Sequence, residues 1–116
     1  MQVSFHLVFG GQCEAAFQFY ERALGGKIVH ANIAVGTAVL AGADILPEQY
    51  AKPRGFYVLL SVDDTADAER IFSALAENGE VKMAIQKTFW SQRFGVLTDQ
   101  FGIPWEINCE QAPAVA

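Results

Sequence analysis

Apolar and polar positions alternate at the start of the chain. From Val3 to Phe9 every odd position is apolar, which predicts a strand that buries the odd-numbered side chains and turns His6 to the opposite face. Between Glu14 and Leu24 the apolar residues recur at helical spacing, and Gly25-Gly26 predicts the end of that helix.

Two further strands are predicted in the first half of the chain. They span Ile28–Val35 and Ala38–Ala43, and Gly36 separates them. The stretch Asp44–Gly55 contains two prolines and several polar residues, so we interpret it as a connector.

The same order of elements then begins again. Phe56–Val62 is rich in β-branched and aromatic residues and predicts a strand. Asp63-Asp64-Thr65 offers N-capping groups for a helix that Asn78-Gly79 ends. Three strands are expected after it, Val81–Gln86, Arg93–Leu97 and Ile103–Asn108, followed by a frayed tail over 110–116.

Superposing the two halves at an offset of 53 residues indicates an internal duplication. The second half has room for one more strand than the first, so we expect a first module one strand short. The modules would cover about 1–44 and 56–109, with a linker at 45–55. The matched pairs are Phe9 with Val62, Ala15 with Ala68, Phe19 with Phe72, and Gly26 with Gly79.

Composition narrows the functional classes. The 116 residues fit one domain or two half-domains that share a core, and 52% of them are apolar. A net charge of −5 argues against nucleic acid and anionic membranes as partners. No cationic run precedes the short apolar stretch at the N-terminus, so we expect a cytoplasmic protein. Cys13 and Cys109 are expected to be free thiols.

Two motifs resemble a known family. Gly11–Tyr20, followed by Leu24-Gly25-Gly26, resembles the first strand-to-helix passage of the PhnB-like branch of the vicinal-oxygen-chelate superfamily, which includes glyoxalases, bleomycin-resistance proteins and dioxygenases. Thr88–Gly95 and Asp99–Trp105 resemble the more specific signature of that branch. The middle section, Val29-His30-Ala31 and Ala43-Asp44, matches as well.

The resemblance implies an α+β fold of two βαβββ-type modules whose mixed, curved sheets enclose a cleft. Members of the family are often dimers, and the unpaired edges that a missing strand would leave in the first module also predict a homodimer. Many members bind a divalent metal through four positions, one on the first strand and one on the last strand of each module. Relatives include lyases, dioxygenases, thiol transferases and binding proteins, so the fold alone does not fix the function.

We expect this chain to lack a complete metal site. Glu106 falls at the last-strand position of the second module, and His6 lies near the first-strand position of the first. Tyr57 stands at the counterpart of His6, and Ala38–Ala43 offers no carboxylate or imidazole. If a metal were present, His6 and Glu106 would hold it, but two protein ligands do not bind an ion tightly.

Alternatives stay open for several side chains. Glu106 either pairs with Arg93 or contacts a ligand, and His6 is either a ligand contact or a wall residue with one hydrogen bond. Trp90 and Phe94 are either core residues or a stacking rim beside Arg93. His30 is expected to pack, Asp99 to cap the turn at Phe101-Gly102, and Cys13, near a helix start, to have a lowered pKa.

Three functions are therefore considered. The first is a non-enzymatic binder of a small, partly aromatic molecule. The second is a metal-assisted lyase or dioxygenase of the glyoxalase type, in which Glu106 would hold the ion or move a proton. The third is a ferredoxin-like dimeric module without a ligand. The binder is preferred, with ligand contacts from His6, Tyr57, Trp90, Arg93, Phe94 and Glu106.

Overall fold

The computed structural model describes residues 1, 3–29 and 32–110. The chain forms two compact units, Met1–Ala51 and Lys52–Ala116, and the boundary between them falls within the predicted connector. His30 and residues 111–116 of the predicted frayed tail lie outside the described residues. Glu110, the first residue of that predicted tail, belongs instead to the last strand.

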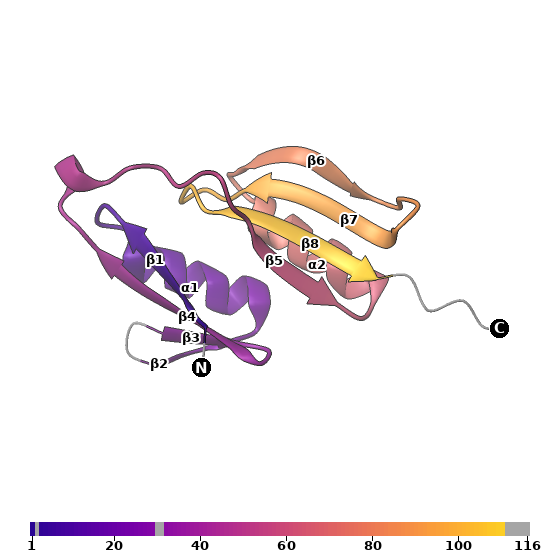
Figure 1. The fold of residues 1–116 in the computed structure, drawn as a ribbon, viewed down its shortest axis with the longest axis horizontal. Helices are drawn as coiled ribbons and strands as arrows, with labels where there is room; N and C mark the ends of the chain where they lie inside the picture. The colour runs from indigo at the N-terminus through magenta and orange to yellow at the C-terminus, as the bar shows by residue number, and fades with distance from the viewer. Residues whose placement is uncertain (2, 30–31, 111–116) are drawn as a thin grey trace. The chain divides into compact units, whose positions relative to one another are not determined.

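The first unit contains one helix and a four-stranded sheet (Figure 1). The strands have the spatial order β1-β4-β3-β2; β1 and β4 run parallel, and the other neighbours are antiparallel. The elements are β1 Phe5–Phe9, α1 Cys13–Leu24, β2 Lys27–Val29, β3 Asn32–Val35, β4 Ala38–Asp44 and a 3-10 turn at Pro47–Gln49.

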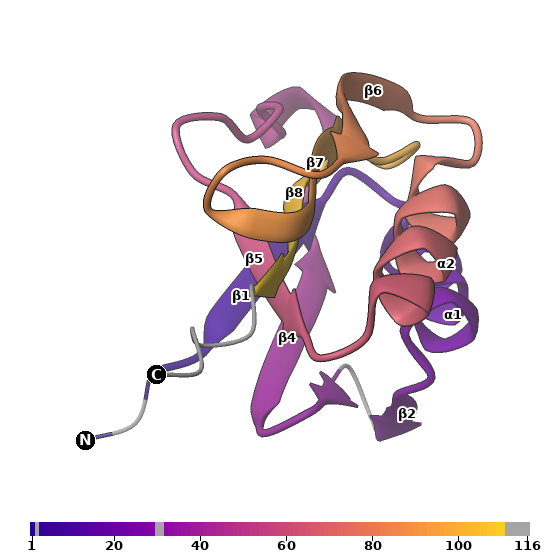
Figure 2. The same ribbon diagram turned by 90° about the vertical axis from the view of Figure 1, so that its right-hand side faces the viewer.

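The second unit repeats this topology. Its spatial order is β5-β8-β7-β6, with β5 and β8 parallel and the other neighbours antiparallel. In both units the helix covers one face of its own sheet (Figure 2), and the opposite face is called the open face below. The elements are β5 Val58–Val62, α2 Thr65–Ala76, β6 Glu80–Gln86, β7 Ser91–Thr98 and β8 Pro104–Glu110.

The first unit is not a strand short. The segment predicted as one strand, Ile28–Val35, forms the two strands β2 and β3, which pair with Val29 opposite Asn32. The intervening sequence, His-Ala, contains no glycine or proline, so the usual turn signal was absent from the pattern. The expected dimer therefore loses its argument from a missing strand, and it stays a prediction.

Each helix packs its apolar face on the strands of its own unit. Leu7 and Phe9 of β1 are buried beneath the first helix, whereas Phe5 at the strand's first position is 45% exposed and Val3 precedes the strand. The prediction that all four odd positions are buried is therefore wrong for the first two. In β8, Trp105 and Ile107 are fully buried, as the alternation predicted.

The duplication is visible within the elements, at two different offsets. The strands β1 and β5 correspond at 53 residues, but the helices α1 and α2 correspond at 52. At 52 the buried positions agree: Ala16 with Ala68, Phe19 with Ile71, Tyr20 with Phe72 and Ala23 with Leu75. The predicted match of Ala15 with Ala68 is wrong, because Ala15 is exposed and Ala68 is buried.

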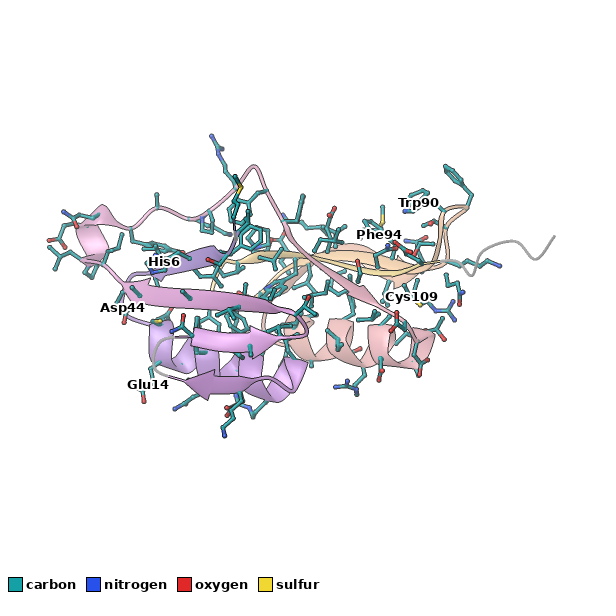
Figure 3. All side chains as sticks on the ribbon, turned by 60° about the horizontal axis from the view of Figure 1, so that its bottom comes forward. His6, Glu14, Asp44, Trp90, Phe94 and Cys109 are labelled. Atoms are coloured by element: carbon teal, nitrogen blue, oxygen red, sulfur yellow. The ribbon has the colours of Figure 1, made fainter. Side chains whose placement is uncertain are left out.

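The helix termini are held by residues that the sequence singled out. Gly25 ends α1 with φ 72°, a left-handed conformation that suits glycine. Asp64 caps α2, accepting a hydrogen bond from the amide of Ala66 at 2.9 Å, as predicted. At the start of α1 the carboxylate of Asp44, at the end of β4, accepts hydrogen bonds from the amides of Gly11 and Cys13 at 2.9 Å (Figure 3).

Candidate functional site

The open face of the second sheet carries two of the six predicted site residues, Phe94 and Glu106, and two more, Tyr57 and Trp90, lie at its margins. Paired residues on neighbouring strands point to the same face, so the strand register arranges this face in rows. The rows are Ser61-Asn108-Phe94-Gln86, Leu59-Glu106-Val96-Met83 and, at the other end, Pro104-Thr98-Glu80. They cover roughly 13 Å along the strands and 14 Å across them.

Glu106 is the carboxylate of the middle row. Its neighbours on that face are Leu59 of β5 and Val96 of β7, and Leu59 is 54% exposed. Within the described residues no cationic side chain lies within ion-pair distance of Glu106. A half-buried carboxylate among apolar groups can accept strong hydrogen bonds from a ligand that carries an N–H or O–H group.

Aromatic rings border the first row. Phe94 lies on the open face beside Asn108, and the ring of Trp90 meets that of Phe94 at 5.7 Å between centroids (Figure 3). Trp90 is 49% exposed and Phe89 is 89% exposed. The turn that carries both is closed by Thr88, whose amide donates to the carbonyl of Ser91 at 2.9 Å. These positions agree with a stacking rim rather than a core role for Trp90.

Arg93 lies on the other side of the same sheet. It stands opposite the buried Cys109, and its Nε donates to Oε1 of Glu69 in α2 at 2.9 Å. Of the two alternatives for Glu106, the pair with Arg93 is therefore not formed. A β-bulge between Ser91 and Arg93 sets this register. The hydroxyl of Ser91 lies 2.7 Å from the carbonyl oxygen of Arg93 and 2.8 Å from that of Cys109, so the two carbonyls share its single proton.

Tyr57 precedes β5 rather than lying within it. The strand begins at Val58, and Tyr57 is 47% exposed. It lines a pocket together with Thr98 and Pro104, which belong to the end row of the open face. The residue of β5 that corresponds to His6 is Leu59, because β1 and β5 are related by 53 positions.

The four positions at which the resemblance places metal ligands can now be compared. In the first unit, His6 is exposed on the open face and stands opposite Ala41 of β4. In the second, Leu59 stands opposite Glu106. Each unit thus offers one side chain that could ligate a metal and one apolar side chain that could not. This set does not fit the four-ligand pattern. No group of three His, Cys, Asp or Glu residues suited to a metal occurs within the described part of the chain.

Cys13 does not have the lowered pKa that its place near a helix start suggested. Burial raises the pKa of this thiol, and the negative charge of Asp44 raises it further. Both cysteines are free, as predicted, and both are buried. Cys13 lines a pocket of about 590 Å³ with Phe17 and Gly42, but a protonated thiol there is a poor nucleophile.

Asp99 has the structural role predicted for it. Its Oδ1 accepts from the amides of Phe101 at 2.8 Å and Ile103 at 3.1 Å. Its Oδ2 accepts from Nε1 of Trp105 at 2.8 Å. The buried carboxylate therefore fixes the turn that leads into β8 and orients the largest core side chain.

The sequence reasoning missed three cationic residues. Lys52, Arg54 and Lys82 line the same pocket as Tyr57, yet the segment that carries the first two was treated as a connector. The sequence did carry a signal for this pocket, because two cationic and two aromatic residues lie within Lys52–Tyr57.

None of the helices in the described part of the chain is long and apolar enough to cross a membrane.

Comparison with known proteins places this architecture in a family. The family model of the Glyoxalase/Bleomycin resistance protein/Dioxygenase superfamily matches residues 3–107. Protein YjdN from Escherichia coli (strain K12) is 31% identical over 139 aligned positions, which cover 93% of this chain and 95% of YjdN. Because 139 exceeds the length of this chain, YjdN carries residues that this chain lacks.

Solved structures share the fold. Protein PA1353 from Pseudomonas aeruginosa superposes with a TM-score of 0.86 at 38% identity, covering 97% of this chain and 99% of its own. The PhnB protein from Bacillus cereus superposes with a TM-score of 0.74 at 14% identity, covering 94% and 99%. At that identity the second likeness concerns the fold alone. These matches exclude the ferredoxin-like alternative.

Proposed function

The chain belongs to the Glyoxalase/Bleomycin resistance protein/Dioxygenase superfamily, and from this premise we propose that it binds a small, partly aromatic molecule without a complete metal site. The ligand rests on the open face of the second sheet. Its apolar part packs on Phe94 and Trp90, and a donor group on it bonds to Glu106.

The observation that carries this proposal is the setting of Glu106. Its carboxylate stands between Leu59 and Val96 on an accessible face, without a cation among the described residues. A carboxylate in such a setting gains more from a ligand's N–H or O–H group than one that already has a partner. Asp99, with its three donors, is the contrasting case within the same unit.

The metal-dependent alternative would need donors that this sheet does not supply. A glyoxalase-type lyase or dioxygenase polarises its substrate through a bound ion. Two of the four positions that would hold the ion are Ala41 and Leu59. The donor set therefore supports binding over metal-assisted catalysis, and the cleft between the modules that the resemblance implies stays a prediction.

A ligand-induced melting screen tests the proposal. Aromatic compounds with an amine or amide donor would be compared with matched compounds that lack the donor. A ligand at 100 times its Kd stabilises the folded state by about 2.7 kcal/mol, which raises Tm by roughly 10 °C in a protein of this size.

Variants locate the site. We expect Glu106→Gln to reduce the preference for donor-bearing compounds, because an amide oxygen is a weaker acceptor than a carboxylate. Phe94→Ala should weaken every hit. Glu48→Gln, at an exposed carboxylate in the first unit, serves as the matched control and should leave the shifts unchanged. Hits that keep their full Tm shift in both Glu106→Gln and Phe94→Ala would place the ligand elsewhere and refute the proposal.

A further inference from the structure

A pocket of about 530 Å³ in the second unit brings together three of the chain's eight Lys and Arg residues. Lys52 and Arg54 come from the segment before β5, and Lys82 comes from β6. Tyr57 contributes a half-exposed ring to the wall. A volume of this size is ordinary for a small-molecule site.

Local backbone features hold these side chains in place. Gly55 has φ 88°, a conformation that glycine adopts without strain, and Pro53 restricts the chain two residues earlier. In β6, Val81 stands opposite Leu97 and Met83 opposite Val96, so Lys82 is the extra residue of a β-bulge. Bulges redirect side chains, and this one brings Lys82 beside Thr98 in the pocket wall.

The pocket is positively charged although the protein carries a net charge of −5. Glu80 is a carboxylate that faces these cations; its Oε1 lies 2.8 Å from Nζ of Lys82. The hydrogen bond from Lys82 and its charge lower the pKa of Glu80, and the charge of Lys52 lowers it further. One carboxylate against three cations leaves an excess of about two positive charges.

We propose that this pocket binds the anionic group of a small aromatic acid, an aryl carboxylate or an aryl phosphate. The planar guanidinium of Arg54 suits a bidentate contact with two oxygens of such a group. Lys52 and Lys82 add two point charges, and the ring of Tyr57 offers an apolar face to the aromatic part.

This inference does not depend on the proposed function. The oxyanion is held by the cations of the pocket and needs neither Glu106 nor Phe94. The two proposals are tested by different variants. The melting screen uses Glu106 and Phe94 variants, whereas the experiment below uses Arg54 and Lys82 variants.

Titration of the ¹⁵N-labelled protein with phenyl phosphate, followed by NMR, tests the inference. We expect saturable shifts of amides in residues 52–57 and at Thr98, and an affinity that falls as the salt concentration rises, because salt screens exposed charges. Benzyl alcohol, a neutral compound with a similar ring, should bind at least tenfold more weakly.

Charge variants supply the decisive comparison. Arg54→Gln and Lys82→Gln should each weaken phenyl phosphate at least fivefold, while Glu80→Gln should strengthen it about twofold by freeing Lys82. Arg70→Gln, at an exposed cation of α2, is the matched control and should have no effect. The inference is overturned if benzyl alcohol binds as tightly as phenyl phosphate, if Arg70→Gln weakens binding as much as the pocket variants do, or if no saturable shifts occur.

Discussion

Asp99 and Glu106 show how differently two carboxylates of one unit are used. Asp99 is 3% exposed, and donors from the turn and from Trp105 surround it. Glu106 is half-buried and has no cationic partner among the described residues. The first therefore stabilises the fold, and the second is the carboxylate that we propose contacts a ligand.

Removing the carboxylate of Asp99 should be costly. Asp99→Ala leaves two backbone amides and the indole N–H of Trp105 without their acceptor, which we expect to lower the free energy of unfolding by about 3 kcal/mol. Urea denaturation measures this change. Asp67→Ala, which removes an exposed carboxylate paired with Arg70, should cost less than about 0.5 kcal/mol; equal losses in the two variants would contradict the role given to Asp99.

Cys13 should make stability depend on pH in the alkaline range. Its pKa is raised in the folded state by burial and by Asp44, so the folded protein holds the thiol proton more tightly than the unfolded chain does. The resulting stabilisation is complete below the unfolded pKa, about 8.5, and is lost as the pH rises through the folded pKa. Urea midpoints from pH 7 to 10.5 should therefore fall more steeply for the wild type than for Cys13→Ala, and parallel curves would refute this.

Asn108 carries an unsatisfied group on the open face. Its Oδ1 is buried and has no hydrogen-bond partner among the described residues. Asn108→Leu keeps the shape and removes this oxygen, so we expect the free energy of unfolding to rise by about 1 kcal/mol. Ser61→Ala, on the same row, is the control in urea denaturation. A destabilised Asn108→Leu variant would show that the amide is already engaged.

Single positions were predictable where the alternation was regular. Glu106 was placed correctly on the face opposite Trp105 because β8 has no bulge in its pairing with β5. Arg93 was predicted to contact a ligand, although the same alternation turns its side chain to the other face of the sheet from that of Phe94. The raised pKa of Cys13 could not be foreseen, because it follows from burial of the thiol and from the charge of Asp44, which lies 31 positions further along the chain.

Among the elements, two equivalent glycines show the duplication most directly. Gly26 precedes β2 and Gly79 precedes β6, and each packs against a backbone carbonyl of the neighbouring strand, that of Ala34 or that of Thr98. A Cβ at Gly79 would lie 2.5 Å from the carbonyl oxygen of Thr98. Close approach of the backbone therefore explains glycine at both positions.

Alanine at either glycine should destabilise the protein. Gly26→Ala and Gly79→Ala each require a backbone shift, for which we expect a loss of about 1–3 kcal/mol. Thermal denaturation of both variants measures it, with Ser73→Ala on the exposed side of α2 as the control. If one glycine tolerates alanine and the other does not, the two positions are not equivalent.

The elements themselves were predictable wherever they were long. Both helices and the strands β1, β4 and β5 follow clear patterns of apolar residues. The hairpin of β2 and β3 was missed because its strands have three and four residues, too few for a period to be read. The helix register was wrong by one residue because the loops before α1 and α2 differ in length, a difference that no periodicity within the helices records.

At the scale of the whole molecule, the chain belongs to the Glyoxalase/Bleomycin resistance protein/Dioxygenase superfamily. The match over residues 3–107 and the superposition on PA1353 establish the superfamily and the fold. The homodimer and the cytoplasmic location stay predictions. The proposed function depends on one feature of this chain. Of the four positions at which the resemblance places metal ligands, His6 and Glu106 could ligate an ion and Ala41 and Leu59 could not.

Isothermal titration of the metal-free protein with Ni²⁺, Zn²⁺ and Mn²⁺ tests that feature most directly. Only two of the four positions, His6 and Glu106, carry a metal-ligating side chain, so we expect no tight stoichiometric binding, since a stable site requires at least three protein ligands. The same titration of Glu106→Ala gives the comparison. Tight one-to-one binding that disappears in Glu106→Ala would contradict the account and identify a metal site centred on this carboxylate.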